Sequence, residues 1–286
     1  MKSYIRLVIL VCCFILPCLG RIEAVSPKDK TVLLAILARN KAHILPKYLE
    51  CLDHLEYNKK LITVYINTNN NEDNTQEILE QWAEKNKDVY RLIEFENHEV
   101  KGMSSSRPHE WTPERFKVLA TIRNKSLQKA KEHKTDYYFV VDCDNFITPF
   151  TLSHLVRKDK PIIAPMLRAV PEPNDAYSNY FCDVSETGYY KNHPDYSKIL
   201  HRQMIGTFKV PVVHCTYLIK SKYLDKLNYI DNTEDYEFVI FSRTARDNHV
   251  DQYICNEKNF GVLLHFYNDL SLEEEKQRSQ GILSFE

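Results

Sequence analysis

The chain has 286 residues, of which 43% are hydrophobic and 27% are charged, and its formal net charge is −1. This is the composition of an ordinary globular protein, with enough residues for one large α/β core or two small domains. The near balance of 38 basic and 39 acidic residues argues against an overall basic surface, so we expect no nucleic-acid partner.

Residues 1–24 are typical of a secretory signal peptide. A basic start precedes the apolar run Leu7–Leu19, and small residues follow at Gly20 and Ala24. The run is shorter than the about 20 residues of a membrane-spanning helix, so we expect no stable membrane span. A short signal anchor is the alternative. Either interpretation places the rest of the chain in the secretory pathway: in the endoplasmic reticulum or Golgi lumen, or outside the cell.

Strands and helices are predicted to alternate through the first half of the chain. Apolar runs predict buried strands at Thr31–Ala38, Leu61–Thr68, Val89–Phe95 and Tyr137–Val141. Helical spacing of apolar residues predicts helices at Ala42–Leu55, Thr75–Lys87 and Pro113–His133. This alternation favours an α/β fold with a mixed, mostly parallel sheet and helices on both faces.

The second half has shorter predicted elements. A hairpin is indicated at Glu186–Gly188 within Ser178–Tyr190, and a β-rich stretch follows at Phe208–Ile219. A helix is predicted over Asp235–Arg246, and short apolar pieces lie at Tyr253–Ile254 and Gly261–Leu264. We interpret residues 27–270 as one domain and residues 271–286 as a charged C-terminal tail or helix.

The chain has only six glycines and lacks both common phosphate-binding loops. No GxGxxG follows the first predicted strand, and no GxxxxGK[ST] is present. A nucleotide bound at this sheet would therefore need other groups around its phosphates.

Asp142 and Asp144 are the strongest candidates for a functional site. They follow directly on the buried strand Tyr137–Val141, and residues i and i+2 at a strand end point the same way. The carboxyl edge of a parallel sheet is where such folds bind ligands. Two carboxylates with phosphate oxygens and water suit Mn²⁺ or Mg²⁺, which would neutralise charge on a departing diphosphate. The alternative is a helix-capping aspartate beside a surface turn.

Three further residues are expected near the donor. Arg39 closes the first strand, at a usual nucleotide contact, and Asp73 lies in the polar run after the second strand. Arg123 lies on the helix before Asp142, where its cation could reach a diphosphate. We therefore predict Arg39, Asp73, Arg123 and Asp142 as donor-binding residues. The alternative is a solvated side chain for Arg123 and a solvated loop for the run that contains Asp73.

An acidic group late in the chain is the candidate for acid–base catalysis. An inverting sugar transferase needs a carboxylate to take the acceptor proton, and Glu234, Asp235 or Glu237 is the candidate base. The alternative is an acidic first turn stabilised by the helix dipole. His265 is a candidate further metal ligand, and His214 is similarly ambiguous because a lone histidine is more often structural.

Much of the chain resembles the N-terminal glycosyltransferase domain of the procollagen galactosyltransferases and of the related cerebral endothelial cell adhesion molecule. The matching pieces occur in family order: LARNKAHILPKYLECL, NEDNTQEILEQW, YYFVVDCDN, IIAPML, AYSNYFC, GYYK, FKVPVVHCTYLI and QYICNEKNFG. The resemblance implies a GT-A-like, Rossmann-type nucleotide-sugar fold, a UDP-galactose or UDP-glucose donor and a Mn²⁺-type metal. It also implies inverting transfer to a hydroxyl, with hydroxylysine of collagen as the family's acceptor.

The leading hypothesis is therefore a metal-dependent hexosyltransferase that uses a UDP-sugar donor and a protein or glycan hydroxyl acceptor. By this resemblance the family's metal-binding pair falls on Asp142 and Asp144, and its late acidic pair falls near Glu234 and Asp235. One alternative is a catalytically inactive adhesion or binding module with the same fold. Another is a metal-dependent phosphotransferase or nucleotidyltransferase that uses the same sheet edge.

Overall fold

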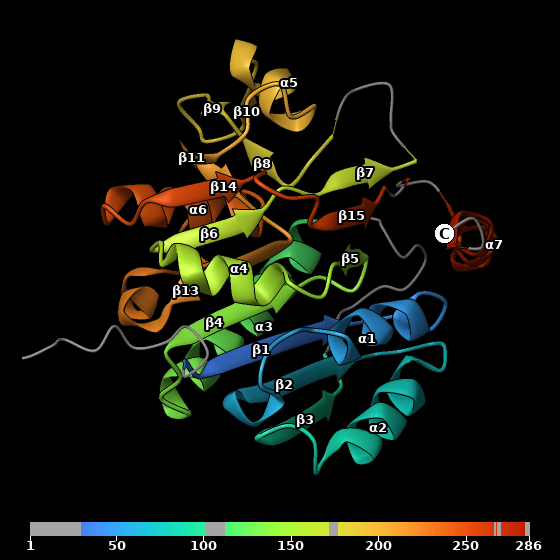
Figure 1. Ribbon diagram of the computed structural model, residues 1–286. Coiled ribbons are helices and arrows are strands. Elements are labelled where there is room, and N and C mark those ends of the chain that lie inside the picture. The colour runs from blue at the N-terminus through green and yellow to red at the C-terminus, as the bar shows by residue number, and fades with distance from the viewer. Residues whose placement is uncertain (1–29, 101–111, 172–176, 266, 268–269, 284–286) are drawn as a thin grey trace, which may run out of the picture.

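A computed structural model of the chain describes residues 30–100, 112–171, 177–265, 267 and 270–283 (Figure 1). The expected signal peptide, residues 1–24, lies outside the described residues. Within the described ranges no helix is long and apolar enough to cross a membrane.

The α-helices and the strands of the large sheet alternate through the first half of the chain. The helices are α1 (Leu45–Asp53), α2 (Thr75–Asn86), α3 (Pro113–Glu132), α4 (Thr151–Lys158), α5 (Pro194–Leu200), α6 (Glu237–Asp247) and α7 (Leu272–Leu283). The large sheet contains β1 (Val32–Ala38), β2 (Ile62–Asn69), β3 (Leu92–His98), β4 (Tyr137–Val141), β6 (Ile162–Pro165), β11 (Thr207–Val210), β13 (Thr216–Lys220) and β14 (Gln252–Cys255).

The large sheet is mixed and mostly parallel, with the strand order β11-β14-β6-β13-β4-β1-β2-β3. Strands β4, β1, β2 and β3 are parallel neighbours, and β14 is parallel to β6. Strand β13 is antiparallel to both β4 and β6, and β11 is antiparallel to β14. This arrangement confirms the α/β fold class predicted from the sequence.

Helices cover both faces of the sheet because its central strands are apolar on both sides (Figure 1). In β1, Leu34 and Ile36 belong to a core shared with α1, α2 and α4. The alternate residues Leu33 and Ala35 belong to a second core, shared with α3, α5 and α6. Every residue from Val32 to Ile36 is fully buried, as expected for a strand packed on both faces.

A smaller three-stranded sheet lies beside the carboxyl edge of β4. It contains β5 (Asn145–Ile147), β15 (Gly261–Leu264) and β7 (Arg168–Val170) in the order β5-β15-β7. The described second half also contains four two-residue strands: β8 (Tyr180–Phe181), β9 (Asp183–Val184), β10 (Tyr190–Lys191) and β12 (Val212–Val213). The small sheet brings residues near position 264 next to the end of β4.

The predicted elements differ from the observed ones in two ways. Strand β3 begins at Leu92 rather than Val89, because the backbone N–H groups of Val89 and Tyr90 bond to the Asn86 carbonyl and close the end of α2. Helices α4 and α5 and strand β6 were not predicted. Helix α4 has eight residues, α5 has seven and β6 has four. Elements this short give no clear periodic pattern in the sequence.

Candidate active site

A cavity of about 570 Å³ opens at the carboxyl edge of β1, β2 and β4. Its walls come from both halves of the chain. The first half contributes the segments that follow β1 and β4, together with α3, and the second half contributes the start of α6 and the end of β15. Of the nine different candidate residues predicted from the sequence, six line this cavity: Arg39, Arg123, Asp142, Asp144, Glu237 and His265.

The two aspartates are presented by a turn that the backbone holds on both sides. The Asp142 N–H donates to the Cys215 carbonyl at 3.2 Å, and the Asp142 carbonyl accepts from the Asn145 N–H at 2.9 Å. The Asp144 carbonyl accepts from the Leu264 N–H at 2.8 Å, across to β15. Cys143, between the aspartates, is buried. Strand β13 on one side and β15 on the other thus fix this turn at the sheet edge.

Arg123 joins Asp142 to Glu237 inside the protein. Its Nη2 donates to both carboxylate oxygens of Asp142 at 3.0 Å, and its Nε lies 3.4 Å from Glu237 Oε1. The Arg123 side chain is only 6% exposed. Burial opposes its charge, but the carboxylates of Asp142 and Glu237 outweigh this and hold the pKa of Arg123 well above its usual value. A permanent cation therefore lies between two carboxylates in the cavity wall.

Asp144 carries a charge that its surroundings only partly favour. Burial is the largest influence on the pKa of Asp144 and raises it, and the like charge of Asp142 raises it further. Lys41, whose Nζ lies 3.5 Å from Asp144 Oδ2, lowers this pKa and offsets part of the rise. The net result raises the pKa of Asp144 to about 6. An additional cation at this place would lower the cost of ionising Asp144.

The groups at this edge have the chemistry of a divalent metal site. Two carboxylates from one turn face the cavity with His265, and the buried Nε2 of His214 has no hydrogen-bond partner among the described residues. Within the described structure the ligand atoms of Asp142, Asp144 and His265 do not all lie within 4.8 Å of one another. The two carboxylates pair with Arg123 and Lys41 instead. The donor set fits Mn²⁺ or Mg²⁺, and such an ion would compete with these two cations for the carboxylates.

The three acidic residues predicted as candidate bases lie in different surroundings. Glu237 begins α6 and is 6% exposed, at the cavity wall beside Arg123. Burial raises the pKa of Glu237, Asp142 adds to this, and Arg123 opposes it. Glu234 is 72% exposed and pairs at the surface with Lys117. The structure brings only Glu237 of the three to the cavity.

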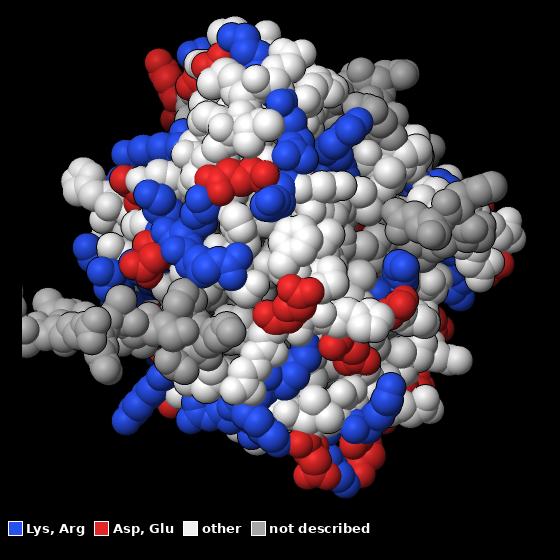
Figure 2. Space-filling model, viewed as in Figure 1, with Lys and Arg blue, Asp and Glu red and all other residues white. Residues whose placement is uncertain are grey.

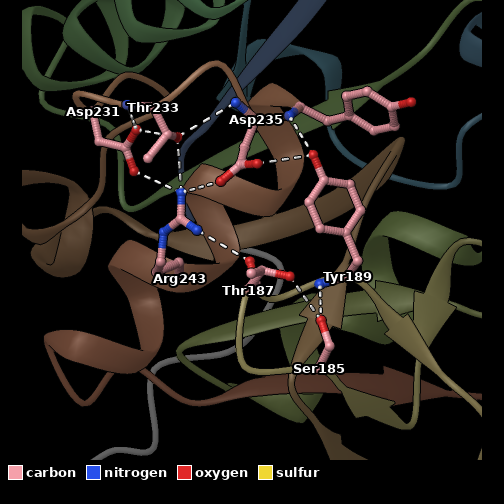
Figure 3. Close-up of polar contacts among 8 residues, drawn as sticks. Ser185, Thr187, Tyr189, Asp231, Thr233, Asp235 and Arg243 are labelled. Atoms are coloured by element: carbon pink, nitrogen blue, oxygen red, sulfur yellow. Dashed lines mark hydrogen bonds and ion pairs between the residues drawn. The ribbon is translucent and has the colours of Figure 1, made fainter.

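Asp235 is held in a polar network outside the cavity (Figure 3). Its Oδ2 accepts from Arg243 Nη2 at 2.8 Å, and its Oδ1 accepts from the Tyr189 hydroxyl at 3.0 Å. Arg243 Nη2 also donates to Asp231 Oδ2 at 2.8 Å, while its Nη1 donates to the Thr187 carbonyl at 3.1 Å. Figure 3 shows Arg243 at the centre of these contacts, between the loop before α6 and the hairpin turn.

The remaining predicted residues divide between the cavity and the loops that support it. Arg39 lines the cavity and donates from Nε to the Asn70 carbonyl at 3.3 Å. Asp73 does not line it: its two oxygens accept from the backbone N–H groups of Ala42 and Thr75 at 3.0 Å, which joins the start of α2 to the loop after β1.

Aromatic residues of the cavity wall were missed by the sequence reasoning. Phe116 on α3 stacks on Tyr236 with ring centroids 4.3 Å apart, although the two are 120 positions apart in the chain. Tyr177 contacts the His265 ring across the cavity edge, with centroids 5.7 Å apart. Tyr177 lies in the segment AYSNYFC, which was noted only for the family resemblance, and no local pattern indicates which aromatic rings meet.

The fold and this sheet-edge site define a GT-A glycosyltransferase domain. Solved structures with the same architecture include Staphylococcus aureus TarS 1–349 (TM-score 0.54, 13% identity, 82% of this chain and 60% of that one). Another is GalNAc-T7 with UDP, GalNAc and Mn²⁺ (TM-score 0.58, 12% identity, 85% of this chain and 45% of that one). At these identities the likeness concerns the fold alone.

The chain belongs to glycosyltransferase family 25, whose N-terminal domain model matches residues 29–279. It is 35% identical over 247 residues to mouse procollagen galactosyltransferase 2, covering 83% of this chain and 39% of that protein. It is 36% identical to zebrafish procollagen galactosyltransferase 1 over 257 residues, 85% of this chain and 42% of that protein. It is also 31% identical to the mouse protein named inactive glycosyltransferase 25 family member 3, over 88% of this chain and 44% of that protein. The chain thus spans about two fifths of the length of these relatives.

Proposed function

We propose that the chain transfers a hexose, galactose or glucose, from a UDP-sugar to a hydroxyl group, with inversion at the anomeric carbon. The observation that carries the proposal is the meeting of Asp142, Asp144, Arg123 and Glu237 in one cavity at the sheet edge. The names of its relatives, procollagen galactosyltransferases, favour a hydroxyl of a collagen-like protein as the acceptor. We place the activity in the secretory pathway because of the expected signal peptide.

Asp142 and Asp144 would hold the divalent ion, with His265 as a further ligand. When bound, Mn²⁺ or Mg²⁺ supplies positive charge to the leaving diphosphate. Arg39 and Lys41, which line the same wall, add cations from the protein for the phosphate oxygens. Arg123 keeps Asp142 in place by two hydrogen bonds of 3.0 Å, so its role is to position this carboxylate.

Glu237 is our candidate for the base. Its carboxylate would take the proton of the acceptor hydroxyl as that oxygen bonds to the anomeric carbon and the bond from that carbon to the diphosphate breaks, releasing UDP. Three features support it over Glu234 and Asp235: it lines the cavity, it is buried, and its pKa is raised toward the neutral range where a base works best.

A second candidate function is a domain that binds a partner or nucleotide without catalysis. Two observations favour it. One relative of similar identity is named inactive. In addition, both aspartates already form ion pairs with protein cations, Arg123 and Lys41, which offset part of their charge without a metal.

The two functions are separated by a donor-hydrolysis assay, which requires no knowledge of the acceptor. The chain without residues 1–24 is incubated with UDP-galactose or UDP-glucose and Mn²⁺, Mg²⁺ or chelator, and released UDP is measured. Transferase function predicts metal-dependent release that is lost in Asp144→Asn and kept in Glu234→Gln, the exposed neighbour of the candidate base. No release with any donor, together with UDP affinity that is equal with and without metal, would support the non-catalytic domain.

A further inference from the structure

A second cluster of metal-ligand side chains lies away from the candidate active site. His154 on α4, Cys255 at the end of β14 and Glu257 two residues later offer one nitrogen, one sulfur and one oxygen within 4.8 Å of one another. None of the three lines the active-site cavity. The transferase chemistry proposed above does not use them.

The separations in this cluster are close to those of a tetrahedral site. Cys255 Sγ lies 3.8 Å from His154 Nε2, and His154 Nε2 lies 3.3 Å from Glu257 Oε2. Zinc bonds of about 2.3 Å to sulfur and about 2.0 Å to nitrogen or oxygen place tetrahedral ligands roughly 3.3 to 3.6 Å apart. The separation between His154 and Glu257 lies in this range, and the separation between Cys255 and His154 exceeds it by a few tenths of an ångström.

The surrounding residues hold the three ligands in place. Glu257 uses its other oxygen, Oε1, to accept from Lys158 Nζ at 2.6 Å and from Thr207 Oγ1 at 3.1 Å, so Oε2 is left facing His154. The ring of His154 meets the Phe260 ring edge-on, with centroids 5.1 Å apart. Support of this kind, which orients ligands through their outer atoms, is usual around metal sites.

The turn that carries Cys255 and Glu257 is also fixed. The buried Asn256 side chain lies between them and donates from Nδ2 to the backbone carbonyls of Ile199 and Met204, at 2.8 and 2.7 Å. The Cys255 carbonyl accepts from the Met166 N–H at 2.8 Å. The thiol and the carboxylate are therefore presented together by a rigid segment.

We propose that His154, Cys255 and Glu257 bind a zinc ion that joins α4 to the end of β14. A thiolate, an imidazole and a carboxylate form a borderline-soft donor set that suits Zn²⁺, whereas the two aspartates of the active site suit Mn²⁺ or Mg²⁺. The fourth position of the tetrahedron would be taken by water. The alternative is a metal-free ion-pair network in which Lys158, Glu257 and His154 stabilise each other.

Cobalt substitution tests the ligand set directly on the chain without residues 1–24. Co²⁺ bound by a thiolate gives a charge-transfer band in the near ultraviolet, which carboxylate sites do not produce. We expect this band in the wild-type chain, its displacement by one equivalent of Zn²⁺, and its loss in Cys255→Ser. Cys215→Ser is the matched control, because Cys215 is a second thiol beside a histidine in the described part of the chain, with Sγ 2.9 Å from His214 Nδ1. A band that is absent, or that disappears in Cys215→Ser and persists in Cys255→Ser, overturns the proposal.

Lys158→Gln distinguishes the zinc site from the ion-pair network. Removing a cation next to Glu257 should strengthen Zn²⁺ binding several-fold by isothermal titration and enlarge the rise in melting temperature on adding Zn²⁺. His154→Gln should abolish that rise. If Lys158→Gln only lowers the melting temperature and Zn²⁺ shifts neither protein, the cluster is a metal-free network. Failure here leaves the donor-hydrolysis result unaffected, so the two proposals fail separately.

Discussion

Asp144 and Glu237 are the two cavity carboxylates whose pKa values the protein raises. Burial is the largest cause of each rise in pKa, and the negative charge of Asp142 adds to both. Lys41 opposes the rise at Asp144, and Arg123 opposes it at Glu237. Groups with such perturbed values gather at functional sites because active sites combine burial with neighbouring charges. At the scale of single residues, this shared perturbation supports the proposal that the cavity is an active site.

We predict that Asp144→Asn raises the stability of the metal-free chain near pH 7.5. The folded-state pKa of Asp144 is about 6, above its ordinary value of 3.8, so the ionised side chain costs stability as pH rises through about 6. Removing the charge should stabilise the fold by about 1 to 3 kcal/mol at pH 7.5, reduced by screening because the side chain is 21% exposed. Urea unfolding in chelator measures this.

Most of the gain from Asp144→Asn should disappear near pH 3.5, where Asp144 is protonated in the folded chain and mostly protonated in the unfolded chain. The variant should also lose the rise in melting temperature that Mn²⁺ with UDP produces in the wild type. A variant that is less stable than wild type at pH 7.5 would show that Asp144 is structural instead.

Glu237→Gln should remove the base without unfolding the chain. We expect the rate of sugar transfer to fall by about 10²- to 10⁴-fold, the usual contribution of a general base. Because the pKa of Glu237 is raised, the wild-type rate should increase with pH up to a value above the ordinary carboxyl range, and this dependence should be missing in the variant. Glu234→Gln, at an exposed position three residues earlier, should keep both rate and profile. Equal rates for Glu237→Gln and wild type would exclude Glu237 as the base.

At the scale of elements, the start of α6 is the segment on which the proposed chemistry depends most. Glu237, which begins this helix, and the preceding residue Tyr236 both line the cavity. The loop before them is anchored by a residue of the same helix, Arg243, which contacts both Asp231 and Asp235 and reaches the hairpin turn at Thr187 (Figure 3). Arg243 therefore anchors the loop that precedes α6, and this loop leads directly into Glu237 at the start of the helix.

Arg243→Gln should loosen this loop while leaving the sheet intact. Its ion pairs are about one quarter exposed, so we expect a stability loss of only about 1 kcal/mol. Transfer should fall several-fold, and the acceptor KM should rise while the affinity for UDP stays unchanged. Arg246→Gln is the matched control, because Arg246 lies on the same helix but donates to the Pro211 carbonyl, away from the loop. Identical kinetics in the two variants would show that the loop needs no such anchor.

At the scale of the whole molecule, the cavity joins distant parts of the chain around one sheet edge. Arg39 and Asp142 come from the first half, whereas Glu237 and His265 come from the second. On the face shown in Figure 2, basic and acidic side chains are interspersed, and the net charge of the chain is only −1. Binding of an anionic donor should therefore depend on the local charges of the cavity.

We predict that UDP binds the chain without residues 1–24 at least about tenfold more weakly in chelator than with Mn²⁺. The carboxylates of Asp142 and Asp144 repel a diphosphate, and their ion pairs with Arg123 and Lys41 offset this only in part. Isothermal titration at constant ionic strength measures the ratio, which corresponds to about 1.4 kcal/mol per factor of ten. Equal affinity under both conditions would mean that protein cations alone bind the diphosphate.

The sequence by itself determined the fold class, the central strands and the position of the two aspartates. Each of these depends on a local signal: the apolar runs of β1, β2 and β4 mark strands buried on both faces, and Asp142 follows where the last of these runs ends. The long amphipathic helices α2 and α3 were predicted to within one residue at each end for the same reason. The resemblance to the procollagen galactosyltransferases was also local, because it depended on short matching segments in order.

Only the tertiary structure decided which of the candidate side chains meet. Glu234, Asp235 and Glu237 are close in sequence, but only Glu237 lines the cavity. Glu234 pairs at the surface with Lys117 on α3, and Asp235 pairs with Arg243 on α6. Asp73, predicted near the donor, instead accepts hydrogen bonds from the backbone N–H groups of two neighbouring segments. These outcomes depend on partners up to 117 positions away, and no pattern within a few residues encodes such long-range contacts.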